Sequence, residues 1–413
     1  MAVEFEPFDA SWKEDLASHY RVLRDEAPVH WAPASGVWCV SRHEDVSFVL
    51  TRPDLFASRR SQERLTANTS RLRMLLGAVR WVWGMRVSPR AMWTQRMLIL
   101  EDGESHRVMR NLVNRGFTPR QIKGWEKRMY ELVDDCMGRI DARGAFDVVE
   151  DLAIPVPVTV IAEMLGVEPE RRHEFKQWSD VIIASGTGSG MGSGLSGPLL
   201  DSMIEMKRYL GPIVKQRRAQ PRDDLISTLV EPGAAALSDH EIFMFFLLLL
   251  IAGNETTTNL IGNAVDALLA DPRCLERVGS DPSAIPGIVE ETLRYDSPVQ
   301  FLTRTAVRDF EIRGQTIREG QEVLAMVGAA NRDERFFPEP DRFDPLRETR
   351  GHLGFGFGAH FCLGASLARL EARCVLERLV PRLPGLRRVR QETELLDSYT
   401  IRGRQRLELC PIA

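Results

Sequence analysis

The longest run of apolar residues in the sequence extends from Ile242 to Ala252. It follows Ser238 and Glu241, whose three-residue spacing is typical of a capping box, and Pro272 marks a stop. The roughly 32 residues in between predict one helix about 48 Å long. Its first half is apolar all round, which indicates burial on every side.

Polar residues interrupt this helix abruptly, in its middle. A buried polar group costs a few kcal/mol unless it finds a partner, so the interruption indicates a function or a specific packing role. The residues concerned are Asn254, Glu255, Thr256, Thr257 and Thr258.

The rest of the pattern is also mostly helical. Apolar residues recur every three or four positions between about residues 101 and 230, whereas short strands are predicted within 30–50 and in FEIRGQTI and QEVLAMVG. ASLARLEARCVLERLV predicts a last helix before C-terminal strands. The fold class is therefore mainly α with a minor β part (α+β). No repeat or clear boundary divides the chain, so we predict a single domain over 1–413.

Composition excludes several classes of protein. The net charge of −4 and pI near 6.1 disfavour nucleic-acid binding. Six scattered cysteines with no C-x-x-C pair fit neither a disulfide scaffold nor a zinc module. The first residues lack a signal-peptide pattern, and an apolar run of eleven residues is short for a membrane span. We predict a cytoplasmic protein with no membrane anchor.

One cysteine lies in an unusual setting. In GFGFGAHFCLG, glycines surround Cys362 just before a helical stretch. Glycines let a backbone approach a large flat partner, and a helix N-terminus stabilises the thiolate that binds metal. The alternative is a buried structural cysteine in a glycine-rich turn.

The motif is longer than one residue. Phe355-Gly356-x-Gly358-x-His360-x-Cys362-x-Gly364 resembles the haem-binding signature of the cytochrome P450 family. Ala252-Gly253-Asn254-Glu255-Thr256-Thr257 resembles that family's oxygen-activating motif, Glu291-x-x-Arg294 its E-x-x-R pair, and Pro340-Asp341-Arg342-Phe343 its P-x-R-F piece. All four occur in family order.

The resemblance implies a monooxygenase with the cytochrome P450 fold, a helix-rich domain with a long central distal helix and small sheets. It implies haem b (iron protoporphyrin IX), with Cys362 as the ligand to the metal. Thr256 would hold an ordered water and Glu255 would relay protons. The alternative for this pair is a threonine bonded to the preceding turn beside an exposed glutamate.

Other roles follow from the same resemblance. Glu291, Arg294 and Arg342 would form a buried structural network. The haem propionates would bind His106, Arg110, Arg304 and His360. The remaining cofactor-binding positions are Ala252, Phe355, Gly356 and Gly364.

A hydrophobic substrate is expected, such as a terpenoid, steroid, fatty acid or macrolide-like molecule. The pocket residues would be Leu248, Ile251, Val299 and Thr400, although ordinary core packing explains the same residue types equally well. The family's variable recognition segment corresponds to 60–100, and its lid to the Gly/Ser stretch Ser185–Pro198, which could equally be a passive linker.

No nucleotide-binding G-x-G-x-x-G motif follows a strand, so electrons would come from NAD(P)H through a separate ferredoxin or flavodoxin with its reductase. Such a partner would dock on basic residues such as Arg107 and Arg369 of a monomeric enzyme. Three alternatives remain open: a peroxygenase, a non-catalytic haem-binding or sensing protein, and a cysteine-nucleophile hydrolase.

Overall fold

The structure is a computed structural model that describes residues 3–13, 15–58, 96–186, 198–222, 224–231, 237–279, 281–391 and 393–412. The chain divides into two compact units. Unit 1 comprises Met1–Ser61, Ile122–Val156 and Thr256–Ala413, and unit 2 comprises Gln62–Gln121 and Pro157–Glu255. The single domain over 1–413 stays a prediction.

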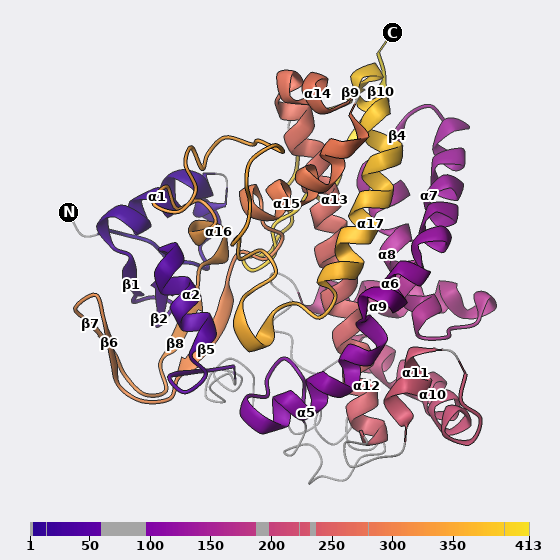
Figure 1. The fold of residues 1–413 in the computed structure, drawn as a ribbon, viewed down its shortest axis with the longest axis horizontal. Coiled ribbons are helices and arrows are strands. Elements are labelled where there is room, and N and C mark those ends of the chain that lie inside the picture. Colours follow the sequence, from indigo (N-terminus) through magenta and orange to yellow (C-terminus); the bar gives the residue numbers. More distant parts are fainter. Residues whose placement is uncertain are drawn as a thin grey trace. The chain divides into compact units, whose positions relative to one another are not determined.

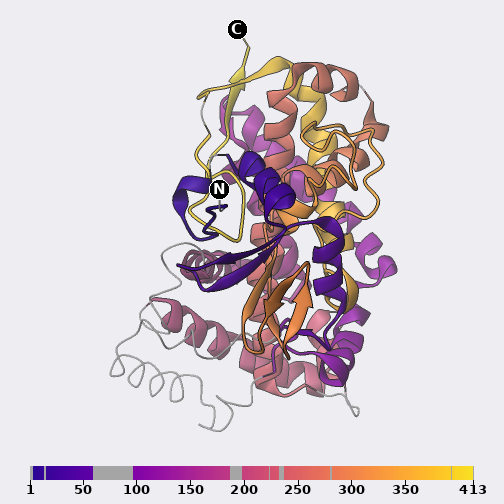
Figure 2. The same ribbon diagram turned by 90° about the vertical axis from the view of Figure 1, so that its left-hand side faces the viewer.

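Unit 1 contains the main sheet, in which early and late parts of the chain pair (Figure 2). The strand order is β1-β2-β8-β5-β3, and only the β2–β8 pair is parallel, with Val37 opposite Glu322. The strands are β1 (Val29–Ala32), β2 (Val37–Val40), β3 (Phe56–Ala57), β5 (Leu302–Ala306) and β8 (Glu322–Ala325).

Both faces of this sheet are buried, as the alternation along β8 shows. Val323 and Ala325 join one apolar cluster with Val49 of α2 (His43–Thr51), whereas Leu324 joins another with Leu23 of α1 (Leu16–Glu26). Successive strand residues point to opposite faces, so one short strand contributes to two cores.

Two smaller sheets complete the β part of unit 1. One has the order β4-β10-β9, formed by β4 (Phe146–Asp147), β10 (Glu408–Pro411) and β9 (Leu386–Arg388). The other is the hairpin of β6 (Phe310–Ile312) and β7 (Gln315–Ile317).

Within unit 1, α17 packs against both α15 and α7 (Figure 1). Their bounds are α7 (Glu126–Asp141), α15 (Ile285–Tyr295) and α17 (Ala365–Leu379). The other helices of three or more residues in this unit are η1 (Ala10–Trp12), η4 (Val149–Ala153), α14 (Pro272–Gly279), η8 (Pro282–Ala284), α16 (Val327–Ala330), η9 (Gly358–His360) and η10 (Val380–Gly385).

The described part of unit 2 is helical. Its members are α5 (Gly103–Asn114), η3 (Arg115–Phe117), η5 (Pro169–Arg171), α9 (Arg172–Gly186), α10 (Pro198–Ala219), α11 (Leu225–Val230), α12 (Asp239–Leu249) and η7 (Leu250–Asn254). Three further helices cross a boundary between the units in sequence: α6 (Pro119–Gly124), α8 (Pro155–Met164) and α13 (Glu255–Ala270).

The predicted long helix is formed by α12, η7 and α13, which together span Asp239–Ala270. Ser238 caps it through the predicted capping box with Glu241, and α13 ends two residues before Pro272. By length and composition alone this helix could cross a membrane, and half of its most apolar stretch is buried.

The prediction of a mainly α fold with a minor β part is confirmed, including strands within 30–50 and a last helix at α17. Two predictions lie largely outside the described residues: the recognition segment within 60–100, and the lid or linker within Ser185–Pro198.

Candidate active site

The polar interruption of the long helix coincides with a change in its hydrogen-bonding pattern. η7 is a π-helical turn between two α-helical segments. Such turns inside α-helices are frequent at functional sites. The polar residues that begin at Asn254 therefore follow a π turn that ends there, and the helix continues through them as α13.

One face of this helix is more exposed than its surroundings. Leu248, Ile251, Glu255 and Thr256 are half-buried and Ala252 is exposed, although most neighbouring residues are buried. Their spacing of three, four, seven and eight residues puts them on one side of a helix. Apolar side chains that stay partly exposed on an otherwise buried helix indicate a face that binds a ligand or a partner.

Glu255 lies at the start of α13, directly before Thr256. Burial raises the pKa of Glu255 to about 7. A carboxyl group with this pKa exchanges protons readily near neutrality, which an ordinary surface glutamate does not do.

The loop before α17 presents Cys362, which is half-buried and forms no disulfide. Its amide donates to the carbonyl of Phe355 at 2.8 Å, so the loop closes on itself across the motif. Gly356 (φ 71°) and Gly358 (φ 75°) have left-handed backbones, which a side chain would strain. Gly364 is the N-cap residue of α17, so Cys362 lies just before that helix's N-terminus.

The four predicted propionate contacts lie on three elements, two of them on α5. In unit 2, His106 is 4% exposed on α5, and Arg110 follows one turn later and donates to Asn114 at 3.1 Å. In unit 1, Arg304 is buried on β5, and the His360 ring lies 3.0 Å from the Ser58 hydroxyl. Binding of one ligand by all four stays a prediction.

Glu291 and Arg294 form a fully buried bidentate pair, with both N···O distances at 2.7 Å. The structure corrects the prediction for Arg342, because its side chain is 55% exposed and only its backbone carbonyl accepts from Arg294. Arg347 is the additional cation here, since its Nε lies 3.3 Å from Glu291 Oε1. The P-x-R-F motif gives no indication of Arg347.

Val299 and Thr400, predicted to line a pocket, lie next to each other in unit 1. Val299 forms a β-bridge with Ile401, and the Gln300 amide donates to the Thr400 carbonyl at 2.8 Å. These contacts attach the C-terminal loop, residues 395–404, to the segment before β5.

Buried charges fix the base of the same C-terminal loop. Arg402 and Arg404 both bind Asp296, at 2.8 and 2.6 Å, and Arg404 also binds Asp266 of α13. Gly403 lies against Asn259, also on α13, so closely that an added Cβ would be 1.8 Å from Asn259 Oδ1. The loop is therefore anchored to the second half of the long helix.

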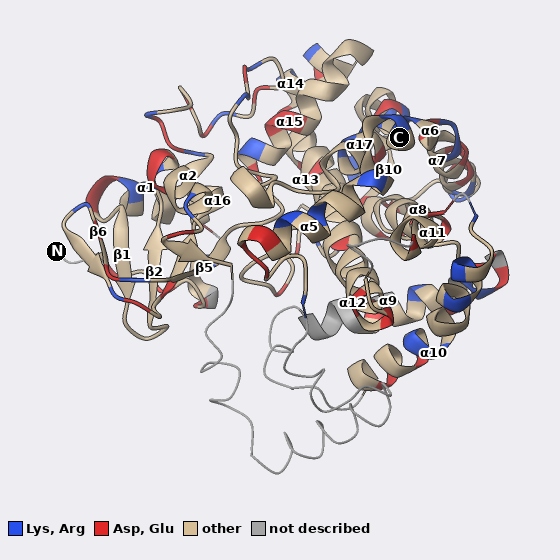
Figure 3. Ribbon diagram, turned by 60° about the horizontal axis from the view of Figure 1, so that its bottom comes forward, with Lys and Arg blue, Asp and Glu red and all other residues tan. Residues whose placement is uncertain are grey.

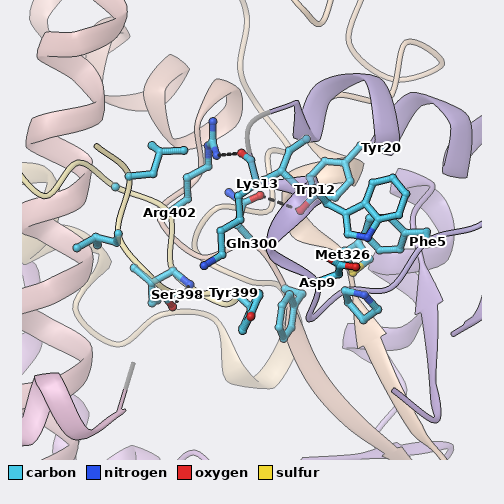
Figure 4. A pocket seen from close by; sticks show the side chains of 17 residues that line it. Phe5, Asp9, Trp12, Lys13, Tyr20, Gln300, Met326, Ser398, Tyr399 and Arg402 are labelled. Carbon is cyan, nitrogen blue, oxygen red and sulfur yellow. Dashed lines mark hydrogen bonds between the residues drawn. The ribbon is translucent and has the colours of Figure 1, made fainter. Parts of the chain in front are cut away.

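A small cavity lies on another side of this loop, between the N-terminal segment and the sheet (Figure 4). Trp12, Tyr20 and Tyr399 contribute aromatic walls. Two hydrogen bonds join lining residues, from Tyr20 to Gln300 and from Arg402 to the Lys13 carbonyl, each 3.0 Å long. Its volume of about 30 Å³ holds about two water molecules. It is too small for a hydrophobic substrate.

The sequence did not identify two carboxyl groups, one fully buried and one half-buried. Glu371 on α17 is fully buried and accepts a hydrogen bond from Thr257, and burial raises its pKa to about 8. Glu290 on α15 binds residues on both sides of the cysteine loop. The sequence of a helix does not show which of its glutamates is enclosed by the protein and which is exposed to solvent.

Comparisons with known proteins agree with these features. A model of the family "Cytochrome P450" matches residues 285–384. Cytochrome P450 107B1 of Saccharopolyspora erythraea is 35% identical over 98% of this chain and 97% of its own length. A steroid C26-monooxygenase of Mycobacterium tuberculosis is 38% identical over 72% of this chain and 81% of its own.

A solved structure gives the same result for the fold. Cytochrome P450 CYP109Q5 from Chondromyces apiculatus matches with a TM-score of 0.86 and 35% identity, over 100% of this chain and 99% of that one. The identity over nearly the full length, the shared fold and the motif around Cys362 lead to one conclusion: this chain belongs to the cytochrome P450 family of monooxygenases.

Proposed function

We propose that this protein inserts one oxygen atom from O₂ into a hydrophobic small molecule, using haem b bound through the sulfur of Cys362. The observation that supports an O₂-driven reaction most directly is Glu255, whose pKa burial raises to about 7 next to Thr256. A reaction that consumes protons at neutral pH needs a group of this kind.

The donor chemistry around Cys362 fits haem. In the part of the chain that the structure describes, no group of three or more His, Cys, Asp or Glu side chains could hold a metal ion. Haem carries the remaining ligands of its own iron, so the single thiolate of Cys362 would be sufficient to attach it. When bound, haem supplies the activation of O₂.

Several residues would hold the haem. Ala252, on the open helix face, and Phe355, Gly356 and Gly364, in the cysteine loop, would lie against the ring. Its two propionates need cationic or hydrogen-bonding partners, because buried carboxylates are costly without them. We assign that role to His106, Arg110, Arg304 and His360.

The protein's own groups would control the protons. The Thr256 hydroxyl would orient a water on the open helix face, and Glu255 would take a proton from solvent and pass it to that water. Because the pKa of Glu255 is about 7, both its protonated and ionised forms are populated at neutral pH.

The substrate would lie against Leu248, Ile251, Val299 and Thr400. These side chains are mainly apolar, which favours a terpenoid, steroid, fatty acid or macrolide-like molecule. Steroids are the first class to test, since a relative that shares 38% identity is a steroid C26-monooxygenase.

Electrons would come from NAD(P)H through a ferredoxin or flavodoxin and its reductase. The two arginines predicted to dock the partner both form ion pairs within the protein, Arg107 with Glu104 and Arg369 with Glu290. Both signs of charge are spread over the described elements (Figure 3). We therefore expect the docking surface to combine several basic residues. The enzyme would act as a cytoplasmic monomer without a membrane anchor.

The test is turnover of a steroid panel with O₂ and a reduced ferredoxin, compared with hydrogen peroxide alone. The proposal expects product with O₂, and a slower reaction in Glu255→Gln. Product formed only with peroxide would identify a peroxygenase, and haem binding without substrate-linked O₂ consumption would identify a non-catalytic haem protein. A reduced, CO-bound form without the red-shifted band of thiolate ligation would reject Cys362 as the ligand.

A further inference from the structure

Glu290 lies next to Glu291 on α15 but binds different partners. Arg369 of α17 donates to its carboxylate through Nε at 2.5 Å and Nη2 at 2.9 Å, and His352 Nε2 lies 3.0 Å from Oε2. Burial alone would raise the pKa of Glu290, but the bonds from Arg369 and His352 lower it to about 2. The carboxylate thus remains ionised and holds both partners at neutral pH.

His352 is the first connection from Glu290 to the cysteine loop. Its Nδ1 accepts a hydrogen bond from the Gly354 amide at 3.1 Å, so Nε2 carries the ring proton and donates it to Glu290. The ring is well enclosed, with 7% of the side chain exposed. Hydrogen bonds at both ring nitrogens therefore fix the orientation of His352. They also fix the backbone amide of Gly354, the residue before Phe355.

Arg369 is the second connection. Its guanidinium lies over the Phe355 ring, 4.6 Å from the centroid, while Glu290 holds the guanidinium by two bonds. The carbonyl of Phe355 accepts the Cys362 amide at 2.8 Å. The Glu290 carboxylate thus acts on Phe355 twice, on the backbone before it through His352 and on its ring through Arg369. Phe355 in turn binds the amide of Cys362.

We propose that Glu290 is a positioning residue for the sulfur of Cys362, acting through His352, Arg369 and Phe355. This inference rests on the proposed role of Cys362 as the iron ligand. Groups that orient a metal ligand through hydrogen bonds commonly change metal affinity 10–100-fold when they are removed. The Glu290–Arg369 pair is therefore part of the ligand's support, and Arg369 is not simply a free surface charge.

The test compares Glu290→Gln with a matched control, Glu126→Gln. Glu126 also binds an arginine of α17, Arg373, and its side chain is similarly exposed, at 34% against 26% for Glu290. Both variants lose one ion pair to the same helix, but only Glu290→Gln loosens the cysteine loop. The measurements are haem content, the urea midpoint, and the rate at which the reduced CO-bound form loses the thiolate-ligated band.

The expected result is loss of that band about tenfold faster in Glu290→Gln than in the wild type, with Glu126→Gln at the wild-type rate. Similar urea midpoints in the two variants would show that general destabilisation is not the cause. Equal band-loss rates in the two variants would overturn the positioning role. A wild-type protein with no thiolate-ligated band would instead reject the proposed function.

A second variant keeps the test decisive if Glu290→Gln binds no haem. Arg369→Lys retains the positive charge but loses the planar, two-bond contact with Glu290 and the stacking on Phe355. We expect faster band loss here too, by a smaller factor than in Glu290→Gln. A wild-type rate in Arg369→Lys would show that the connection through Phe355 does not position the sulfur.

Discussion

Thr257 donates a hydrogen bond to Glu371, so the residue that follows Thr256 in the long helix is bound to a fully buried carboxyl group of α17. Burial raises the pKa of Glu371 to about 8, which keeps this group protonated at neutral pH. In the unfolded chain the same group ionises at its ordinary pKa of 4.5.

The first prediction concerns stability at alkaline pH. Because the folded pKa of Glu371 lies above the unfolded one, its contribution is fully present below about pH 4.5 and is lost as pH rises through about 8. We expect the free energy of unfolding to fall by on the order of 4 kcal/mol between about pH 5 and pH 9 from this group. Glu371→Gln should remove that fall.

Urea unfolding of the haem-bound protein at both pH values measures the effect. Thr257→Val is the control, because it deletes the hydrogen bond but retains the ionisable group, and so should keep the pH dependence. An unchanged pH slope in Glu371→Gln would mean that another group causes it.

The second prediction concerns the proton relay. Glu255→Gln preserves shape but cannot exchange a proton, so we expect substrate turnover to fall by about 100-fold. The wild-type rate should decline as pH rises through about 7, because the protonated form of Glu255 disappears there. A flat pH profile in the variant, with normal haem content, supports the role. A wild-type rate in Glu255→Gln refutes it.

The third prediction separates the two arginines near Glu291. Arg347→Ala should destabilise the protein clearly, because its side chain is 12% exposed and binds a fully buried carboxylate. Arg342→Ala should change the free energy of unfolding by less than about 0.5 kcal/mol, as is usual for exposed positions. Glu291→Gln should cost about 3–5 kcal/mol and lower haem content, because it leaves Arg294 buried without its counter-charge.

Thermal or urea unfolding of the three variants is sufficient for this comparison. Equal losses for Arg347→Ala and Arg342→Ala would contradict the assignment.

The fourth prediction concerns the anchor of the C-terminal loop. Arg404 and Arg402 hold the pKa of Asp296 well below its usual value, although burial opposes them. Stability from this carboxylate is therefore present above about pH 4 and is lost as pH falls below that. Asp296→Asn should lose this acid sensitivity and release the loop that carries Thr400.

A loosened loop should raise KM for a bulky substrate more than it lowers kcat, because the role proposed for Thr400 is in substrate binding. Kinetics of Asp296→Asn with two substrates of different size would show this. Equal changes in KM for both substrates would argue against a link between Asp296 and the substrate pocket.

Structural features that depend on a short local pattern could be predicted from the sequence. Ser238 and Glu241 form the predicted capping box, and the glycines before Cys362 form a loop with left-handed backbone positions. Glu291 and Arg294 are one helical turn apart, so their pairing follows from local geometry as well.

Contacts between distant segments could not be predicted in this way. Arg347 binds a glutamate 56 residues earlier, and Arg369 binds one 79 residues earlier. Such pairs depend on how α15 packs against its neighbours, which residue spacing does not encode. The raised pKa of Glu371 likewise arises from burial. The pattern of polar and apolar residues along α17 does not show which of its glutamates is buried.

The anchoring of Gly403 against Asn259 has a practical consequence for protein engineering. A residue larger than glycine at 403 would meet the Asn259 amide directly, and Arg402 and Arg404 beside it are fixed by Asp296. Because Thr400 is the proposed substrate contact in this loop, a library aimed at new substrates should diversify Thr400 and leave residues 402–404 unchanged. Such a library would vary the proposed substrate contact and preserve the buried ion pairs that hold the loop.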